Sequence, residues 1–174
     1  MRSLGLAALA LFAACGYQIG QSCIVDTDCS ADGSRVCDIS EPDGYCTILG
    51  CDYDTCPSNS ECVKFYTGQF SNKPCDYETE NVTTDACSYN EECSLDNTCV
   101  PSTAEERYCM ATCSSNGDCR SGYECRHFND TIGSDGEYED DSMQRDGGEV
   151  VLPPGQKNTS STGGFCAPSP TSPV

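Results

Sequence analysis

The sequence predicts a small disulfide-rich fold, made of two tandem eight-cysteine modules with short strands, long loops and little regular secondary structure. The first observation is that 17 of the 174 residues are cysteine, a density typical of small scaffolds that fold in oxidising compartments. The second is that core-forming residues are scarce: beyond Ala14 there are three Leu, five Ile, eight Val, four Phe and no Trp. Because so little apolar surface does not offset the entropy of ordering the chain, covalent cross-links have to supply the stability.

The segment 1–14 has the features of a secretory signal peptide. Arg2 supplies a positive charge, an uncharged apolar run follows it, and the small residues Ala13 and Ala14 precede Cys15. The apolar run is too short to cross a bilayer, for which a helix needs about 20 residues. The mature protein is therefore expected to lie outside the cytoplasm, where disulfides form and persist.

The end of this segment, LFAAC, resembles the lipobox of bacterial lipoproteins. The resemblance implies that Cys15 becomes the mature N-terminus and carries a diacylglyceryl group on its sulfur. Setting Cys15 aside leaves sixteen cysteines, the even number that a disulfide framework requires. The alternative is an ordinary secretory signal with a cysteine near its cleavage site.

Zinc is the competing interpretation of so many cysteines, and their spacing argues against it. The closest pair, Cys109 and Cys113, has three residues between its members, and no C-x-x-C occurs. The chain therefore lacks both the usual zinc knuckle and a thioredoxin-like redox pair. Its single histidine, His127, adds little to a metal site. We expect disulfides, no metal and no cofactor.

The cysteines fall into two sets of eight, and six of the seven successive steps agree within two residues between the sets. An acidic residue precedes the second cysteine in both sets, a tyrosine the fourth and a glutamate the seventh. The first set is Cys23, Cys29, Cys37, Cys46, Cys51, Cys56, Cys62 and Cys75, and the second is Cys87, Cys93, Cys99, Cys109, Cys113, Cys119, Cys125 and Cys166. We interpret them as two homologous modules with four internal bridges each, the alternative being coincidental spacing.

The organisation that follows has six segments: signal peptide 1–14, tether 15–22, module 23–75, linker 76–86, module 87–166 and disordered tail 167–174. Within the second module, residues 129–164 form an acidic insertion rich in glycine, which we expect to be a mobile loop. Eight cysteines allow 105 pairings, so connectivity is not readable. As a hypothesis, Cys62–Cys75 and Cys125–Cys166 are equivalent bridges, because both would close the last step, whose length varies.

Secondary structure is expected to be sparse. Aromatic and β-branched residues flanking cysteines predict short strands at Gly44–Leu49, Glu61–Tyr66 and Tyr123–Phe128. A short helix is predicted at Ser102–Cys109, where a serine or threonine cap precedes two glutamates.

Most of the chain resembles, in its general cysteine pattern, the cysteine-rich lipoproteins common in myxobacteria. The motifs that carry the resemblance are LFAAC, CIVDTDC from Cys23, CSYNEEC from Cys87 and CSSNGDCRSGYEC from Cys113. No catalytic or binding residue carries over from it. Because no acidic residue follows Cys15, the rule for lipoprotein sorting in double-membrane bacteria implies the outer membrane.

Other chemistry has weaker support. Alternate carboxylates in the stretch 135–141 could attract Ca²⁺, but they do not match the EF-hand spacing, and a solvated acidic loop is the simpler interpretation. His127 stands alone, and neither a serine-centred motif nor a glycine-rich phosphate loop occurs. The sequons at Asn81, Asn129 and Asn158 would mark glycosylated loops only in a eukaryotic secreted protein.

The sequence thus predicts a lipid-anchored cell-surface protein with a binding, adhesion or envelope-structural role and no catalytic residue. Its partners would be the membrane, through Cys15, and an extracellular protein or glycan ligand. The net charge of −19 makes the surface repel nucleic acid, so none is expected as a partner. Solubility is the simplest explanation of this charge, and a cationic partner or divalent cations are the alternatives. The alternative is a freely secreted disulfide-rich ligand or protease-inhibitor-like protein, and a hydrolase with carboxylate catalysis is a distant third.

Overall fold

The protein is described here by a computed structural model that covers residues 18–67, 73–80, 86–95, 97–127, 146–159 and 162–169. These residues form short strands, one single-turn helix and two 3-10 turns, held by disulfides. The small disulfide-rich class predicted from the sequence, with short strands and little regular secondary structure, is therefore confirmed. The elements are α1 (Asp26–Cys29), β1 (Val36–Asp38), β2 (Tyr45–Thr47), β3 (Ser60–Tyr66), β4 (Glu91–Cys93), β5 (Cys99–Pro101), η1 (Ser102–Ala104), β6 (Glu105–Cys113), η2 (Asn116–Asp118), β7 (Tyr123–Arg126), β8 (Asp146–Val150) and β9 (Gly164–Pro168).

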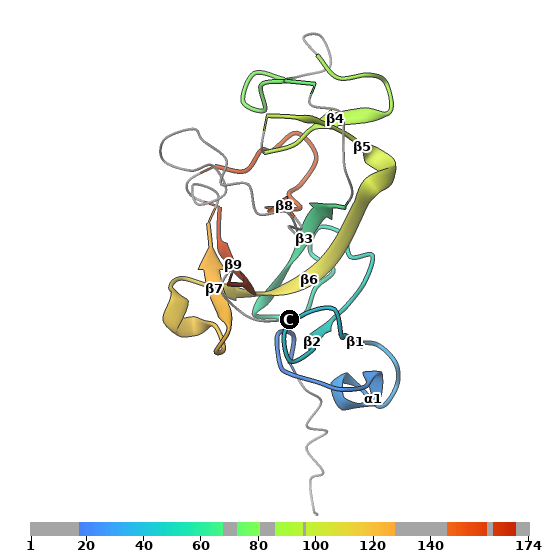
Figure 1. The fold of residues 1–174 in the computed structure, drawn as a ribbon, viewed down its shortest axis with the longest axis vertical. Coiled ribbons are helices and arrows are strands. Elements are labelled where there is room, and N and C mark those ends of the chain that lie inside the picture. Colours follow the sequence, from blue (N-terminus) through green and yellow to red (C-terminus); the bar gives the residue numbers. More distant parts are fainter. Residues whose placement is uncertain are drawn as a thin grey trace, which may run out of the picture.

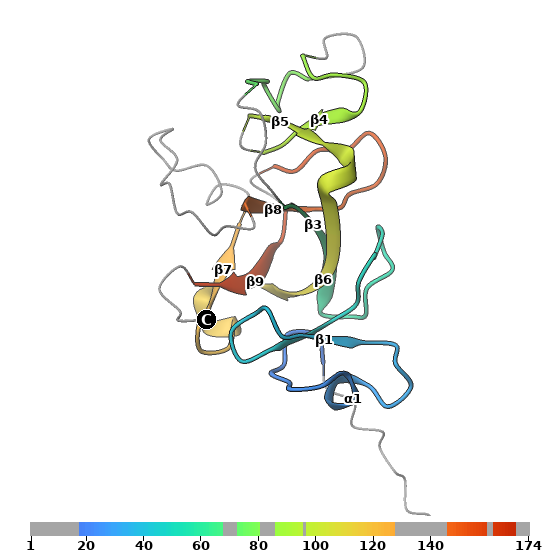
Figure 2. The ribbon, with the colours of Figure 1, turned by 45° about the vertical axis from the view of Figure 1, so that its right-hand side comes forward.

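A five-stranded sheet in the order β7-β9-β6-β3-β8 forms the middle of the molecule, and its neighbouring strands are antiparallel. Two separate hairpins complete the fold, β1-β2 and β4-β5. Figure 1 and Figure 2 show the hairpins at opposite ends of the long axis, with α1 beside β1. The molecule therefore has two distinct ends, one built by the first third of the described chain.

The central sheet curls around its own core. A Cβ added to Gly148 in β8 would lie 2.7 Å from Phe165 in β9 and 2.6 Å from Phe65 in β3. β8 and β9 are not neighbours in the strand order, so this approach requires the sheet to close toward itself. The rings of Phe65 and Phe165 pack edge to face inside, with centroids 6.1 Å apart, and Val63 is fully buried beside them.

Eight disulfides pair all sixteen scaffold cysteines. They are Cys23–Cys37, Cys29–Cys46, Cys51–Cys62, Cys56–Cys109, Cys75–Cys93, Cys87–Cys99, Cys113–Cys125 and Cys119–Cys166. One unit accounts for all of them: three cysteines spaced C-x4–5-C-x5–7-C, of which the first and third bond locally and the second bonds a distant cysteine. The four units begin at Cys23, Cys51, Cys87 and Cys113.

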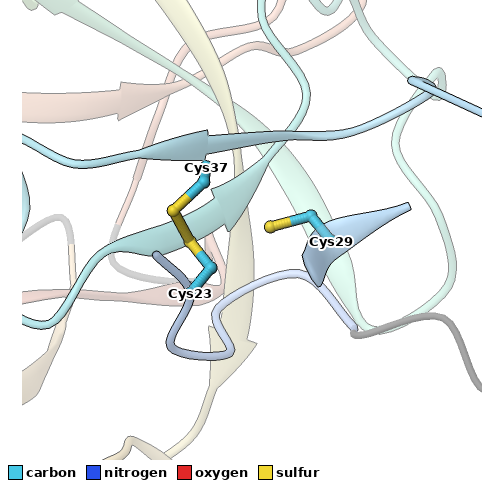
Figure 3. A group of neighbouring side chains, drawn as sticks. All are labelled: Cys23, Cys29 and Cys37. Atoms are coloured by element: carbon cyan, nitrogen blue, oxygen red, sulfur yellow. A yellow bond between two sulfur atoms is a disulfide. The ribbon is translucent and has the colours of Figure 1, made fainter. Parts of the chain in front are cut away.

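Each unit makes its local bridge in the same way. The loop between the second and third cysteines turns through a left-handed residue, supplied by Gly33, Asn59, Asn97 and Gly122 in turn, because glycine and asparagine tolerate positive φ. In three units the third cysteine lies directly opposite the distant cysteine in an antiparallel ladder, and these register pairs are Cys37↔Cys46, Cys62↔Cys109 and Cys125↔Cys166. Figure 3 shows the resulting crowding of sulfur in the first unit.

The first and fourth units also share two side-chain caps. Asp28 accepts hydrogen bonds from the backbone N–H groups of Ile24 and Val25, at 2.9 and 3.1 Å, and Asp118 accepts equivalent bonds in the fourth unit. Asp26 accepts a bond from the backbone N–H of the third cysteine, at 2.8 Å. Asn116 does the same in the fourth unit. These polar side chains order the turn by accepting hydrogen bonds from its backbone.

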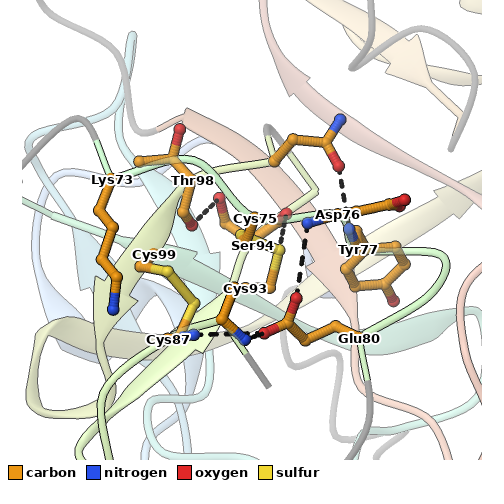
Figure 4. The surroundings of a disulfide bond; sticks show 12 residues. Lys73, Cys75, Asp76, Tyr77, Glu80, Cys87, Cys93, Ser94, Thr98 and Cys99 are labelled. Atoms are coloured by element: carbon orange, nitrogen blue, oxygen red, sulfur yellow. Dashed lines mark hydrogen bonds between the residues drawn. A yellow bond between two sulfur atoms is a disulfide. The ribbon is translucent and has the colours of Figure 1, made fainter. Parts of the chain in front are cut away.

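The third unit takes its distant cysteine from upstream. Cys75 lies beside β5, where its backbone N–H bonds the carbonyl of Asn97 at 2.9 Å. Figure 4 shows Glu80 reaching back to the backbone N–H of Cys87. The asparagine side chain also accepts a bond from the N–H of Tyr77. The segment that precedes the unit is thus folded against it.

The expected pairing within two modules is wrong. Cys62 bonds Cys51 and not Cys75, which bonds Cys93, while Cys125 bonds Cys113 and not Cys166. Two bridges, Cys56–Cys109 and Cys75–Cys93, cross between the proposed modules. The reason is that β3 and β6 pair over seven residues in one sheet, so the two halves fold together.

Of the predicted elements, the three strands are confirmed within a few residues by β2, β3 and β7. The helix predicted at Ser102–Cys109 is wrong: only η1 is helical, and β6 begins at Glu105. An eight-residue helix is marginal by itself, whereas a strand at this place gains ladder bonds from β3 and packs Met110 into the core. Tertiary pairing therefore overrides the local cap signal.

Several segments expected to be loose are ordered. In the tether, Ile19 is buried in the core; in the linker, Tyr77 is buried; in the tail, Ala167 belongs to β9. The acidic insertion contributes β8 to the central sheet and buries Asn158. Each segment pairs with a strand or fills the core, which composition alone does not reveal. Residues 128–145 and 170–174 lie outside the described part.

Candidate functional site

The residues singled out from the sequence are distributed as follows. Cys15, Asn81, Asn129 and the acidic stretch 135–141 lie outside the described residues. His127 is partly buried, with its Nε2 atom 3.4 Å from the Cys125 sulfur, and it packs against Gly164. The histidine therefore fills space beside a disulfide.

Cysteine sulfur atoms gather in four clusters in which three of them lie within 4.8 Å of one another. This is the density that a zinc site would have. Every member is bonded in a disulfide, however, and zinc binds thiolates. Each cluster is the place where the two bridges of one unit lie side by side.

A buried polar network joins β3, β4, β8 and the segment 73–80. The Lys64 ammonium lies 3.1 Å from a Glu92 oxygen and 3.3 Å from a Glu149 oxygen. Tyr77 donates its hydroxyl to Glu149 at 2.7 Å, and the Asn158 amide donates to the same carboxylate at 3.2 Å. Burial disfavours the charged form of Lys64, but the two carboxylates outweigh it and raise its pKa. Glu149 Oε1 accepts both hydrogen bonds, while Glu149 Oε2 has the ion pair with Lys64 and no hydrogen bond. Because its charges are paired within the fold, the network is a structural one.

A second carboxyl is partly buried, and one of its oxygens has no hydrogen-bond partner. Glu61 lies in β3, and its Oε1 atom is shielded from solvent and has no hydrogen-bond partner. Burial raises the pKa of this carboxyl from 4.5 to about 7. An unsatisfied buried carboxyl whose pKa is perturbed is a functional-site candidate.

Glu61 lines a cavity of about 190 Å³ at the junction of β3, β8 and the second cysteine unit. Three apolar residues that follow one another, Val150, Val151 and Leu152, form one wall. Tyr53, which is 51% exposed, and Asp54 also line the cavity, so it reaches the surface. The arrangement offers negative charge at an apolar and aromatic pocket.

Sequence reasoning noticed Glu61 only as the residue before a cysteine. The signal that could have found it is strand alternation, which places Glu61 on the same face as Val63 and Phe65. A charged residue on the strand face that carries two core residues departs from the usual alternation of apolar and polar side chains. Its neighbours Val150 to Leu152 come from a segment expected to be a loop, so the cavity itself was not predictable.

Comparison with protein families, with curated proteins and with solved structures finds no match to this chain. None of the helices in the described residues has the length and apolar character needed to cross a membrane. The class that can be stated is that of a small disulfide-rich protein.

Proposed function

We propose that this is a lipid-anchored cell-surface protein, held at the outer membrane through a lipid on Cys15, with a binding, adhesion or envelope-structural role and no catalysis. Its partners are the membrane and an extracellular protein or glycan ligand. The lipobox-like LFAAC and the odd seventeenth cysteine support the anchor. A lipid anchor with two or more chains holds a protein stably without a spanning helix.

The observation that carries this proposal is that residues only a few positions after Cys15 already belong to the fold. The backbone N–H of Gly20 donates to the Cys46 carbonyl, and the N–H of Cys46 donates to Gln21, both at 2.9 Å. Ile19 packs into the main core. Only three residue steps separate Cys15 from Gln18, which is at most about 11 Å of extended chain. A lipid on Cys15 would therefore hold the first cysteine unit against the bilayer.

The first unit is firmly attached to the rest of the protein, so an anchor there would orient the whole molecule. Tyr45 accepts a hydrogen bond from the backbone N–H of Ala111 at 2.9 Å and stacks on Tyr123, with ring centroids 5.4 Å apart. The Arg120 guanidinium lies 4.0 Å from the Tyr123 ring centroid and donates to the carbonyl of Pro42. Cation–π and charged hydrogen bonds of this kind are among the stronger polar contacts.

The alternative, a freely secreted ligand or inhibitor-like protein, has less support. Its best sequence feature is the set of three glycosylation sequons, and Asn158 is 5% exposed. Its side-chain nitrogen donates to Glu149 and to the Val150 carbonyl. A glycan on that nitrogen is incompatible with the folded protein. Cys15 still decides between the two functions.

The test is the intact mass of the unreduced protein from its native envelope after thiol alkylation. We expect a species that begins at Cys15, carries acyl mass and takes up no alkyl group. Cys15→Ser should lose the acyl mass and leave the membrane fraction, while Ser22→Ala, at an exposed position, should retain both. A lipid-free wild-type protein beginning elsewhere would refute the anchor.

A further inference from the structure

We propose that the cavity beside Glu61 binds the ammonium end of an aliphatic amine, such as the side chain of a lysine on a partner protein. This site lies in β3 and β8 and does not use Cys15. The inference therefore goes beyond the proposed anchoring and can fail or succeed independently of it.

The first argument is that the Glu61 carboxyl lacks a hydrogen-bond donor. No hydrogen bond or ion pair to Glu61 is formed within the described residues, and one of its oxygens is buried. Gly163 leaves room beside it, since a Cβ there would lie 3.5 Å from the other oxygen, Oε2. Leaving a buried acceptor unsatisfied is unfavourable, and a bound donor removes that penalty. An ammonium group both donates hydrogen bonds and neutralises the carboxylate.

The second argument is the chemistry of the rest of the lining. Val150 and Leu152 offer apolar contact for a methylene chain, while the Tyr53 ring can face a cation. Asp54 adds a second negative charge. A bare Ca²⁺ ion fits poorly, because it needs six to eight oxygen ligands and these walls are largely apolar. An anion is disfavoured by both carboxylates.

The third argument is size. A cavity of about 190 Å³ is smaller than the roughly 300–1,000 Å³ of sites that enclose a whole small molecule. It accommodates one long side chain or a short amine. The overall charge of −19 further favours the approach of a cationic partner.

The experiment follows the methyl resonances of Val150, Val151 and Leu152 in isotope-labelled, fully oxidised protein. The probes are n-butylammonium and Nα-acetyl-lysine-methylamide. Their uncharged counterparts are n-butanol and the same methylamide with norleucine in place of lysine. We expect both amines to shift these methyls saturably, and their counterparts to bind at least fivefold more weakly. Tighter binding of the lysine probe would indicate a protein side chain as the natural ligand, and tighter binding of butylammonium would indicate a free amine.

Three variants make the result specific. Glu61→Gln should weaken amine binding at least fivefold, and Tyr53→Ala, at a half-exposed residue, should weaken it to a smaller extent. Glu78→Gln removes the same charge at an exposed position and should bind like the wild type. Equal binding by Glu61→Gln, or equal shifts from butanol, would overturn the proposal, because the amine would then be held by general charge or by apolar contact alone.

Discussion

At the residue scale, the partly buried position of the Glu61 carboxyl lowers the stability of the folded protein at neutral pH. Glu61 has a pKa raised by burial to about 7, whereas Asp28 and Asp118 have pKa values lowered by bonds from backbone N–H groups. The aspartates contribute to the fold in their charged form, and Glu61 opposes it. Residues that lower stability are retained most readily where they serve binding.

The first prediction concerns Glu61→Gln. Between pH 4.5 and about 7 the folded protein retains a proton that the unfolded chain has lost, so wild-type stability falls as pH rises through this window. Glutamine has no such proton. We expect the variant to match the wild type near pH 4.5 and to be more stable at pH 8, measured by thermal melting. Glu78→Gln is the control, and a Glu61→Gln variant that is less stable than the wild type at pH 8 would contradict the argument.

A second prediction concerns the caps Asp28 and Asp118. Their lowered pKa values mean that their contribution is present above 3.8, the ordinary aspartate value, and is lost as pH falls through the folded-state pKa. Asp28→Asn and Asp118→Asn should therefore lower the melting temperature at pH 7, and the difference from wild type should shrink at pH 2. Asp43→Asn, in the connection between β1 and β2, offers a comparison outside the unit. A difference that persists unchanged at pH 2 would exclude the charged cap as the cause.

At the element scale, the repeated unit is a turn with a left-handed residue, to which the first and fourth units add two side-chain caps. One local bridge closes the turn, and a second bridge joins it to a cysteine outside the unit. The local bridge closes 11 to 14 residues, whereas the distant bridges close up to 53. Loop-closure entropy grows with loop length, so the two kinds of bridge are not equivalent. The two longest, Cys56–Cys109 and Cys119–Cys166, join a unit to a strand of the central sheet.

The third prediction compares two bridges of the second unit. Removing Cys56–Cys109 as the double alanine variant should lower the free energy of unfolding by about 1 kcal/mol more than removing Cys51–Cys62, because the separations are 53 and 11 residues. Denaturant unfolding with the other seven bridges intact measures both. Equal losses would show that the chain entropy of the longer loop is not the difference between them.

At the scale of the whole molecule, the two ends differ in what they expose. The first unit presents Ile24, Val25 and Ile39, which are 83%, 52% and 76% exposed. The opposite end carries the β4-β5 hairpin, with Tyr89 fully exposed beside it. If the proposed lipid on Cys15 anchors the chain, the first unit would contact the membrane and the hairpin would point away from it. The contact would be apolar, since the acidic chain is repelled by anionic lipid.

The fourth prediction uses the absence of tryptophan from the chain. Ile39→Trp and Tyr89→Trp each introduce a single tryptophan, at opposite ends of the molecule. In acylated protein reconstituted into uncharged vesicles, we expect the fluorescence of the first variant to shift to the blue and that of the second to stay as in solution. A blue shift at Tyr89→Trp alone would reverse the orientation, and none at Ile39→Trp would leave the first unit off the bilayer.

The sequence by itself determined the class of the protein, because cysteine density and the lack of apolar residues leave disulfides as the only sufficient source of stability. It also determined three strands, whose aromatic and β-branched residues have the right local preference. The tertiary structure alone decided the pairing of the bridges, because Cys56 and Cys109 meet only once β3 and β6 form one ladder.

The cavity, like the pairing of the bridges, depends on contacts between segments that are far apart in the sequence. The strand at Glu61 was predictable. The apolar wall of the cavity, however, comes from β8 and the residues after it, a segment that the sequence led us to expect as an acidic loop. Long-range pairing decides which segments become strands when their own propensity is weak, and only the folded chain brings Glu61 beside Val150.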